Sequence, residues 1–368
     1  MTLPRSVRQV GFIDVVCPTE SIALLDVLAK GDIPIQPGMT SDGAPPLLFV
    51  AGAPRSGTTW LAKIFDSHPN VLYRHEPDLV VAEPRLPTIC DSDALDPYLR
   101  IARDYVGRLV STCDLKTAGK LPNFPKAHDT WFSRPARLAA IVGLRAAARL
   151  TPAHLLRRCM LPEFHVYAHA PRPHVVIKSI SALGRVGLFA EAMPDARIVL
   201  LVRDPFGQIA SRMVGEAKGK LPVGHFDLRL LRTPQAERFQ LSPTQLERCT
   251  PVELMAWDWL ITNQKSHDDL QSRSNACIAH YGDLVADPLQ EARRLFAFAE
   301  LPWHAACERF IQRSISYRGP DRYFQVLRDG ARSLGKWRDV LSADDQSRIL
   351  DIVGRAPIGR RCLGALPA

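Results

Sequence analysis

Residues 52–60 read Gly-Ala-Pro-Arg-Ser-Gly-Thr-Thr-Trp and directly follow the apolar run 47–51. Two glycines at this spacing permit a tight turn, and the backbone N–H groups of such a turn and of a following helix attract an anion. A nucleoside triphosphatase of the Walker type carries Lys where this chain has Thr58. The cation is instead Arg55, inside the loop, which favours a monophosphate-type group over a triphosphate.

A second anion anchor follows the apolar run 198–202. Arg203 ends that run, Asp204-Pro205 has the chemistry of a helix start, and Ser211 lies eight residues past Arg203. A strand would deliver Arg203 at its carboxyl end, with Ser211 two turns along the next helix, so that both converge on a second phosphate. A structural ion pair between Arg203 and Asp204 remains an open alternative.

These two motifs resemble those of one enzyme family. Residues 54–61 closely resemble the 5'-phosphosulfate loop of sulfotransferases that use 3'-phosphoadenosine-5'-phosphosulfate (PAPS), and Arg203 with Ser211 is similar to their 3'-phosphate pair. Looser similarity continues at 281–288, where Gly282 replaces the usual acid, and at 335–338. The resemblance spans about residues 46–354. It implies PAPS as donor, 3'-phosphoadenosine 5'-phosphate (PAP) as product and no metal. The cofactor-binding residues that it implies are Arg55, Ser56, Gly57, Thr58, Thr59, Trp60, Arg203, Ser211, Tyr281, Arg332, Lys336, Trp337 and Arg338.

Sulfuryl transfer also needs a base that removes the acceptor's proton. Glu76 lies 21 residues after Arg55, at the end of an expected strand over 71–75. Carbohydrate- and tyrosylprotein-type sulfotransferases place a catalytic Glu in a similar setting, whereas the cytosolic phenol and steroid enzymes use a Lys-x-His pattern that Lys178-Ser179-Ile180 lacks. We therefore expect Glu76 to be the base, with His75 as a competitor. An ion pair of Glu76 with Arg74, or a helix-capping role, stays open.

Lys178 closes the apolar run 175–177. A lysine at the end of a buried strand is costly unless it meets an anion. The resemblance implies that Lys178 contacts the bridging oxygen of the donor and assists departure of the nucleotide. An exposed lysine at the strand end is the alternative.

The elements that must position these residues alternate along the chain. Apolar runs at 47–51, 175–177, 198–202 and 277–281 suit strands buried on both faces of a parallel sheet. Helical periodicity lies between them, at about 58–67, 182–192, 205–216, 251–271, 288–299 and 342–354. This order predicts an α/β, three-layer P-loop-like fold with a central parallel sheet flanked by helices. We expect an N-terminal appendage over 1–44 and a single domain over 45–368, with acceptor-side insertions at about 83–172 and 217–250.

The composition and charge of the chain limit the kinds of function that it can have. The chain has 368 residues, 46% hydrophobic and 23% charged, and a net charge of +9 carried mostly by scattered arginine. The charge favours an anionic ligand, and without zinc, helix-turn-helix or RNA-binding signatures we expect no nucleic-acid partner. Eight dispersed cysteines predict neither a metal site nor a disulfide framework. With no signal-peptide pattern or apolar run of membrane-spanning length, a cytoplasmic, reducing compartment is the expectation.

The acceptor stays open at this stage. A hydroxyl or amine of a small molecule, a carbohydrate or a lipid-linked sugar would each serve, and the oligomeric state is not determined. The arginine-rich stretch 134–158 has three interpretations: an acceptor lid, a contact with a membrane surface, or a packed helix with a solvated arginine face. A P-loop kinase and a non-catalytic nucleotide-binding module are the alternatives to a sulfotransferase.

Overall fold

A computed structural model describes residues 45–119, 121–150, 161, 172–221, 226–319 and 334–364, with only the backbone for 148–150. The expected appendage 1–44 and Arg332 lie outside the described residues.

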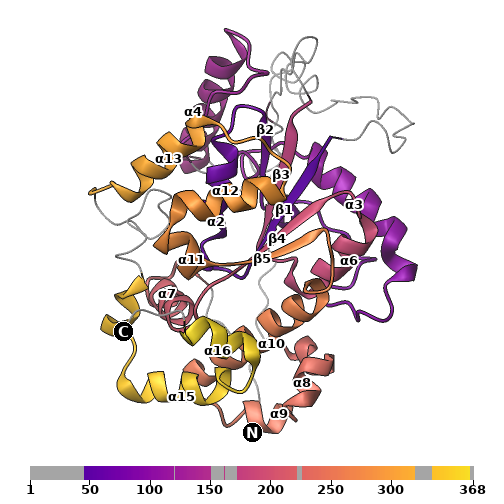
Figure 1. Cartoon of the computed structure of the whole chain (residues 1–368), viewed down its shortest axis with the longest axis vertical. Helices are drawn as coiled ribbons and strands as arrows, with labels where there is room; N and C mark the ends of the chain where they lie inside the picture. The colour runs from indigo at the N-terminus through magenta and orange to yellow at the C-terminus, as the bar shows by residue number, and fades with distance from the viewer. Residues whose placement is uncertain are drawn as a thin grey trace, which may run out of the picture. The chain divides into compact units, whose positions relative to one another are not determined.

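The core of the described chain is a five-stranded sheet whose strands are all parallel. Its strand order is β2-β3-β1-β4-β5 (Figure 1). The strands are β1 (Leu47–Ala51), β2 (Val71–His75), β3 (His174–Ser179), β4 (Arg197–Val202) and β5 (Ala276–His280). Four of them lie at the predicted apolar runs, and β2 is the strand that was expected separately over 71–75. The last is shifted by one residue, because Tyr281 begins helix α11 (Tyr281–Ala286) instead of ending the strand.

Helices cover both faces of this sheet, because alternate residues of each strand point to opposite sides. Leu48 and Val50 of β1 pack with α2 (Thr58–Asp66), α12 (Pro288–Phe298) and α13 (Ala305–Ile315). Phe49 and Ala51 pack with the opposite layer, which contains α3 (Leu99–Ser111), α6 (Val186–Ala192) and α10 (Pro251–Leu270). Figure 1 shows the two layers on either side of the strands. The predicted three-layer α/β fold is confirmed.

The other described helices connect or cover these layers. They are α4 (Ser133–Leu150), α7 (Pro205–Ala217), α8 (Pro234–Arg238), α9 (Pro243–Leu246), α15 (Ala343–Val353) and α16 (Pro357–Gly364), with short 3₁₀ turns at Pro77–Leu79, Asp96–Tyr98, Leu183–Arg185, Leu228–Arg232 and Lys336–Asp339.

Helix α3 lies within the expected insertion 83–172, yet it is part of the core. Its side chains Ala102, Tyr105, Val106 and Leu109 are buried against the sheet layer. Part of that stretch therefore builds the fold rather than an acceptor-side addition.

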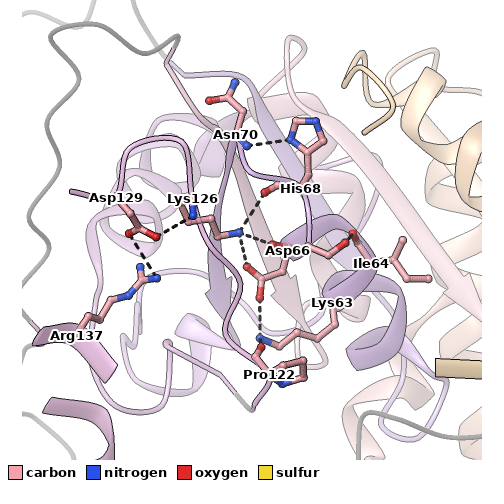
Figure 2. A network of polar contacts seen from close by, with 10 residues as sticks. Lys63, Ile64, Asp66, His68, Asn70, Pro122, Lys126, Asp129 and Arg137 are labelled. Carbon is pink, nitrogen blue, oxygen red and sulfur yellow. Dashed lines mark hydrogen bonds and ion pairs between the residues drawn. The ribbon is translucent and has the colours of Figure 1, made fainter. Parts of the chain in front are cut away.

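A buried ionic network fastens the segment around 122–129 to the end of α2 (Figure 2). Asp66 accepts from Lys63 at 2.7 Å and from Lys126 at 2.9 Å, and Lys63 also donates to the Pro122 carbonyl at 3.1 Å. Burial alone would raise the pKa of Asp66, but the charges of Lys126 and Lys63 outweigh it and lower that pKa. The carboxylate thus stays ionised and holds the segment against the sheet edge at β2.

None of the helices in the described ranges is both long enough and apolar enough to cross a bilayer.

Candidate active site

The phosphate turn joins β1 to α2 as the sequence predicts. Gly57 caps the helix with φ +98°, and Arg55 also has a positive φ of 73°. Both are in the left-handed region, which lets the chain fold back so that Ser56 N–H donates to the Ala53 carbonyl at 3.0 Å. The loop ends in helical N–H groups, with no side chain capping them.

The interior of this turn fits an oxyanion. The Ser56 hydroxyl is fully buried, and its Oγ has no hydrogen-bond partner among the described residues. A Cβ added to Gly52 would come within 2.7 Å of that oxygen and within 2.6 Å of the Leu201 carbonyl, so only glycine leaves the hollow open. A buried hydroxyl without a partner is costly unless a ligand supplies one. Thr58 and Thr59 begin the helix beside it.

The second anchor meets the first. Arg55 Nε donates to Ser211 Oγ at 2.9 Å, and Arg203 Nη1 donates to the Arg55 carbonyl at 3.1 Å. Asp204 caps α7 by accepting from Gly207 N–H at 2.5 Å. Its carboxylate lies 3.7 Å from Arg203 Nε, so the ion pair weighed as the alternative exists beside the contact with the loop. The two motifs, whose arginines are 148 residues apart, are therefore in direct contact.

Aromatic rings lie around these two motifs. Arg203 lies over the Tyr281 ring at 4.8 Å, and Tyr281 meets Trp60 edge-on with ring centroids 6.4 Å apart. Trp60 is buried in the hydrophobic cluster of the α2 face. Trp337 stacks on Phe206 at 4.6 Å near the start of α7.

The C-terminal basic segment lies beside the same helix. Arg338 lies over the Trp337 ring at 4.5 Å. Both residues belong to the 3₁₀ turn Lys336–Asp339, which Lys336 begins. The structure thus brings this segment to α7, the helix that carries Ser211.

Glu76 lies between two lysines at the carboxyl edge of the sheet. It follows β2 directly, with a left-handed φ of 50°. Lys178 Nζ donates to Glu76 Oε1, and Lys116 Nζ donates to Oε2 at 2.5 Å. Lys178 is only 2% exposed, which excludes the exposed strand-end alternative.

The two lysines determine the charge state of Glu76. Burial disfavours the carboxylate, but Lys178, His75 and the Lys116 bond outweigh it and lower the pKa of Glu76 to about 2. Burial also lowers the pKa of Lys178, and the Glu76 charge opposes that effect. Glu76 is therefore an anion at neutral pH.

His75 is buried beside this pair. Its Nδ1 and the Tyr73 hydroxyl are hydrogen-bonded at 2.8 Å, and its Nε2 lies 3.8 Å from Glu76 Oε1. Burial holds the pKa of His75 well below its usual range, and the charge of Lys178 is the second cause. The imidazole is neutral at pH 7 and lies beside the carboxylate.

The sequence did not identify Lys116. It lies 40 residues from Glu76, on a turn in which Asp114 Oδ1 accepts from Thr117 N–H at 2.7 Å. His75 N–H donates to the Thr117 carbonyl at 2.8 Å, which fastens this turn to the end of β2. The Asp-x-x-Thr spacing does signal a turn, but nothing local shows where that turn docks.

The chain is similar to known sulfotransferases. The profile of the sulfotransferase family matches residues 46–305. Carbohydrate sulfotransferase 1 of Homo sapiens is 25% identical over 326 residues, covering 81% of this chain and 74% of the human protein. Carbohydrate sulfotransferase 3 of Mus musculus is 26% identical over 149 residues, covering 39% and 29% of the two chains. Among solved structures, a mouse sulfotransferase complexed with PAP is similar at 12% identity, with a TM-score of 0.43 and coverage of 88% and 89%.

The family match covers well over half of the chain, and it includes the phosphate turn, Glu76, Lys178, Arg203 and Ser211. The kinase and the non-catalytic module are set aside accordingly. The chain belongs to the sulfotransferase family, and it transfers a sulfuryl group from PAPS to an acceptor.

Proposed function

We propose that the acceptor is a hydroxyl group of a carbohydrate or of a carbohydrate-bearing molecule. Support comes from the human carbohydrate sulfotransferase, which is similar over 81% of this chain. The type of base agrees, because Glu76 follows a strand end and residues 178–180 lack the Lys-x-His pattern of phenol and steroid enzymes. A sugar hydroxyl is a weak acid, so its attack on sulfur needs a base.

We further propose that Glu76 is this base, and the observation that carries the proposal is its buried contact with Lys178. As the acceptor oxygen bonds to sulfur, Glu76 takes the acceptor proton. The bond from sulfur to the bridging oxygen breaks, and Lys178 donates to that oxygen as it gains the electron pair. The carboxylate thus acts on the acceptor oxygen and the ammonium on the bridging oxygen, and the sulfuryl group moves between these two oxygens.

Charge competition explains how Glu76 gains basicity. A carboxylate with a pKa of about 2 is a poor base, because the optimum lies near the working pH. Lys178 makes the largest of the contributions that lower this pKa. If Lys178 turns to the bridging oxygen of the donor, Glu76 loses that contribution and its pKa rises. The ion pair therefore links donor binding to activation of the base.

The donor supplies the activated sulfuryl group and a nucleotide leaving group. Arg55, Ser56 and the N–H groups around Gly57 would hold its 5'-phosphosulfate, and Arg203 and Ser211 would hold its 3'-phosphate. Among these residues, the Ser56 hydroxyl supports the fit most directly, because it is buried and has no hydrogen-bond partner in the described part of the chain.

A two-part experiment tests these proposals. Acceptor classes are incubated with isotope-labelled PAPS, and products are identified by the mass shift of the sulfonate. We expect labelled carbohydrate. Label confined to phenols, amines or peptides contradicts the proposed acceptor.

The second part compares Glu76→Gln with the unaltered protein. We expect kcat to fall about 10²–10⁴-fold, with PAP affinity changed less than about threefold. A variant that retains turnover refutes the role of Glu76 as base. The matched change Glu247→Gln, at an exposed position outside the site, should leave turnover unaltered.

The expected cytoplasmic, reducing compartment remains a proposal. It is supported by the described cysteines, which are all free thiols: Cys90, Cys113, Cys249, Cys277, Cys307 and Cys362. Fractionation of cells that express the chain would test it.

A further inference from the structure

Glu76, Lys178 and the phosphate turn follow one another along the carboxyl edge of the sheet. Glu76 follows β2, Lys178 lies near the end of β3, and the turn follows β1, in the strand order β2-β3-β1 (Figure 1). Lys178 pairs with Val50, two residues before Gly52 opens the turn. Lys178 therefore stands between Glu76 and the turn, and of the two lysines on Glu76 it is the one that can reach a donor held there.

Lys116 approaches Glu76 from the other side of β2. Glu76 N–H donates to the Lys178 carbonyl of β3 at 2.7 Å, whereas the preceding N–H, that of His75, donates to the Thr117 carbonyl at 2.8 Å. Consecutive N–H groups of a strand point in opposite directions, so the turn that carries Lys116 covers the outer edge of β2. Glu76 and Lys178 consequently separate Lys116 from the donor.

The backbone of this turn is fixed, although the Lys116 side chain is exposed. Asp114 N–H donates to Thr117 Oγ1 and Thr117 N–H donates to Asp114 Oδ1, both at 2.7 Å. These two residues are fully buried. Beyond them, Arg145 of α4 donates to the Gly119 carbonyl at 2.5 Å. Hydrogen bonds within the turn, to β2 and to α4 thus hold the backbone from which Lys116 extends.

The two lysines contact different oxygens of the Glu76 carboxylate. Lys178 donates to Oε1, and Lys116 donates to Oε2 at 2.5 Å. The Lys178 side chain is buried, whereas the Lys116 side chain is 42% exposed. An exposed ion pair contributes little to stability, but a donor on a fixed turn does determine which way a carboxylate faces.

We propose that Lys116 is a positioning residue, which holds Oε2 of Glu76 while Oε1 takes the proton of the acceptor hydroxyl. Lys178 releases Oε1 as it turns to the bridging oxygen of the donor. Lys116 stays in place, because Glu76 and Lys178 lie between it and the donor, and it keeps the released oxygen directed at the acceptor. This inference rests on the proposed role of Glu76 as base, and it adds the group that orients this base.

Turnover of Lys116→Met tests the positioning. The variant keeps a side chain of similar length that donates no hydrogen bond, so the carboxylate can rotate once Lys178 has left. We expect kcat, with the carbohydrate that accepts label in the screen above, to fall about 10–100-fold, since a small misplacement of a reacting group costs up to about 10²-fold. The melting temperature should change by less than about 4 °C, and PAP affinity by less than about threefold. Lys116→Arg keeps a cationic donor and should restore most of the lost turnover.

The matched control is Lys218→Met. Lys218 is also exposed, and it lies at the end of α7 that is far from Asp204 and the carboxyl edge of the sheet. Its turnover should equal that of the unaltered protein. An equal fall in Lys116→Met and Lys218→Met would mean that loss of any exposed lysine slows the protein, which contradicts the proposal.

A titration provides a readout that needs no acceptor. Burial raises the pKa of Glu76, whereas Lys178, His75 and the hydrogen bond from Lys116 lower it. Without that bond the pKa rises, so the Glu76 carboxyl should titrate at higher pH in Lys116→Met than in the unaltered protein. Carbon-13 NMR of the glutamate-labelled protein with PAP bound measures this titration, and Glu76→Gln assigns the signal. Lys218→Met should leave it unmoved.

The double variant Glu76→Gln/Lys116→Met shows whether the lysine acts through the carboxylate. Its kcat should equal that of Glu76→Gln alone, because the group that Lys116 positions is already lost. A further loss in the double variant overturns the proposal. So does a raised KM for the acceptor with unchanged kcat in Lys116→Met, or a Glu76 signal that titrates at the same pH as in the unaltered protein.

The positioning and the proposed function can fail separately. If Glu76→Gln retained turnover, the assignment of the base would be wrong. If Glu76→Gln lost turnover while Lys116→Met kept it, the base would stand and the positioning by Lys116 alone would be refuted.

Discussion

Glu76 and Lys178 are joined twice. Glu76 N–H donates to the Lys178 carbonyl at 2.7 Å, and the Lys178 ammonium donates to the Glu76 carboxylate. The register of β2 on β3 produces this pairing, because His75 stands opposite Lys178 and Glu76 is the next residue. The proposed base and the group proposed to assist the leaving oxygen are thus positioned by one backbone contact.

Removing either lysine next to Glu76 should have unequal effects. Lys178→Met leaves a buried carboxylate without its buried partner, which typically costs about 3–5 kcal/mol. Lys116→Met removes a partner whose side chain is 42% exposed, and such pairs contribute about 0–1 kcal/mol. Urea unfolding of the two variants measures the difference. Equal losses would contradict the assignment of Lys178 as the buried partner.

Acid should destabilise the protein partly through Glu76. Its pKa is lowered in the folded state, so its contribution to stability is complete above the unfolded value of about 4.5. That contribution is lost as the pH falls from there toward about 2. Glu76→Gln has no such carboxylate, so its melting temperature should fall less between pH 5 and pH 3. Thermal unfolding of both proteins across this range provides the measurement, with Glu247→Gln as the exposed control. A parallel fall in all three proteins would show that Glu76 is not ionised in the pair.

The sheet and the phosphate turn were predictable because their signals are local. Strands buried on both faces appear as continuous apolar runs, and β1 and β4 lie where these runs are. Helix α3 was also predictable from the sequence, since its buried residues have helical spacing: Ala102, Tyr105, Val106 and Leu109. The prolines and arginines around it obscured that pattern.

The contacts of Lys116 and of Arg55 could not be predicted in the same way. Lys116 meets Glu76 across 40 residues, and Arg55 meets Ser211 across 156. Such pairs form only when turns and strands that are far apart in the sequence pack together. A short stretch of sequence does not show which of them pack together. Their residue types were visible, but the partners were not.

Donor affinity should depend on the Ser211 hydroxyl. Ser211→Ala removes a hydroxyl that accepts from Arg55 at 2.9 Å and that we place on the 3'-phosphate. A bond to a charged group is worth about 1.5–3 kcal/mol, so PAP should bind about 10–100-fold more weakly. Titration calorimetry with PAP measures this loss. Adenosine 5'-phosphate lacks the 3'-phosphate and serves as the control ligand, since its affinity should not change. A loss shared by both ligands would place Ser211 elsewhere on the nucleotide.

A methyl group at Gly57 should damage both the turn and its ligand site. Gly57 has φ +98°, and an added Cβ would lie 2.5 Å from Cδ2 of Tyr281, the ring under Arg203. Gly57→Ala therefore combines a left-handed backbone, which costs about 1–3 kcal/mol, with a displaced aromatic ring. We expect a lower melting temperature and at least tenfold weaker PAP binding. Gly107→Ala is the matched control, because Gly107 lies inside α3 with no atom within 4 Å of its added Cβ. There alanine should stabilise the helix by about 0.5–1 kcal/mol. If Gly57→Ala bound PAP normally, the left-handed turn would be a feature of the fold alone, and the donor's 5' group would have to be held elsewhere.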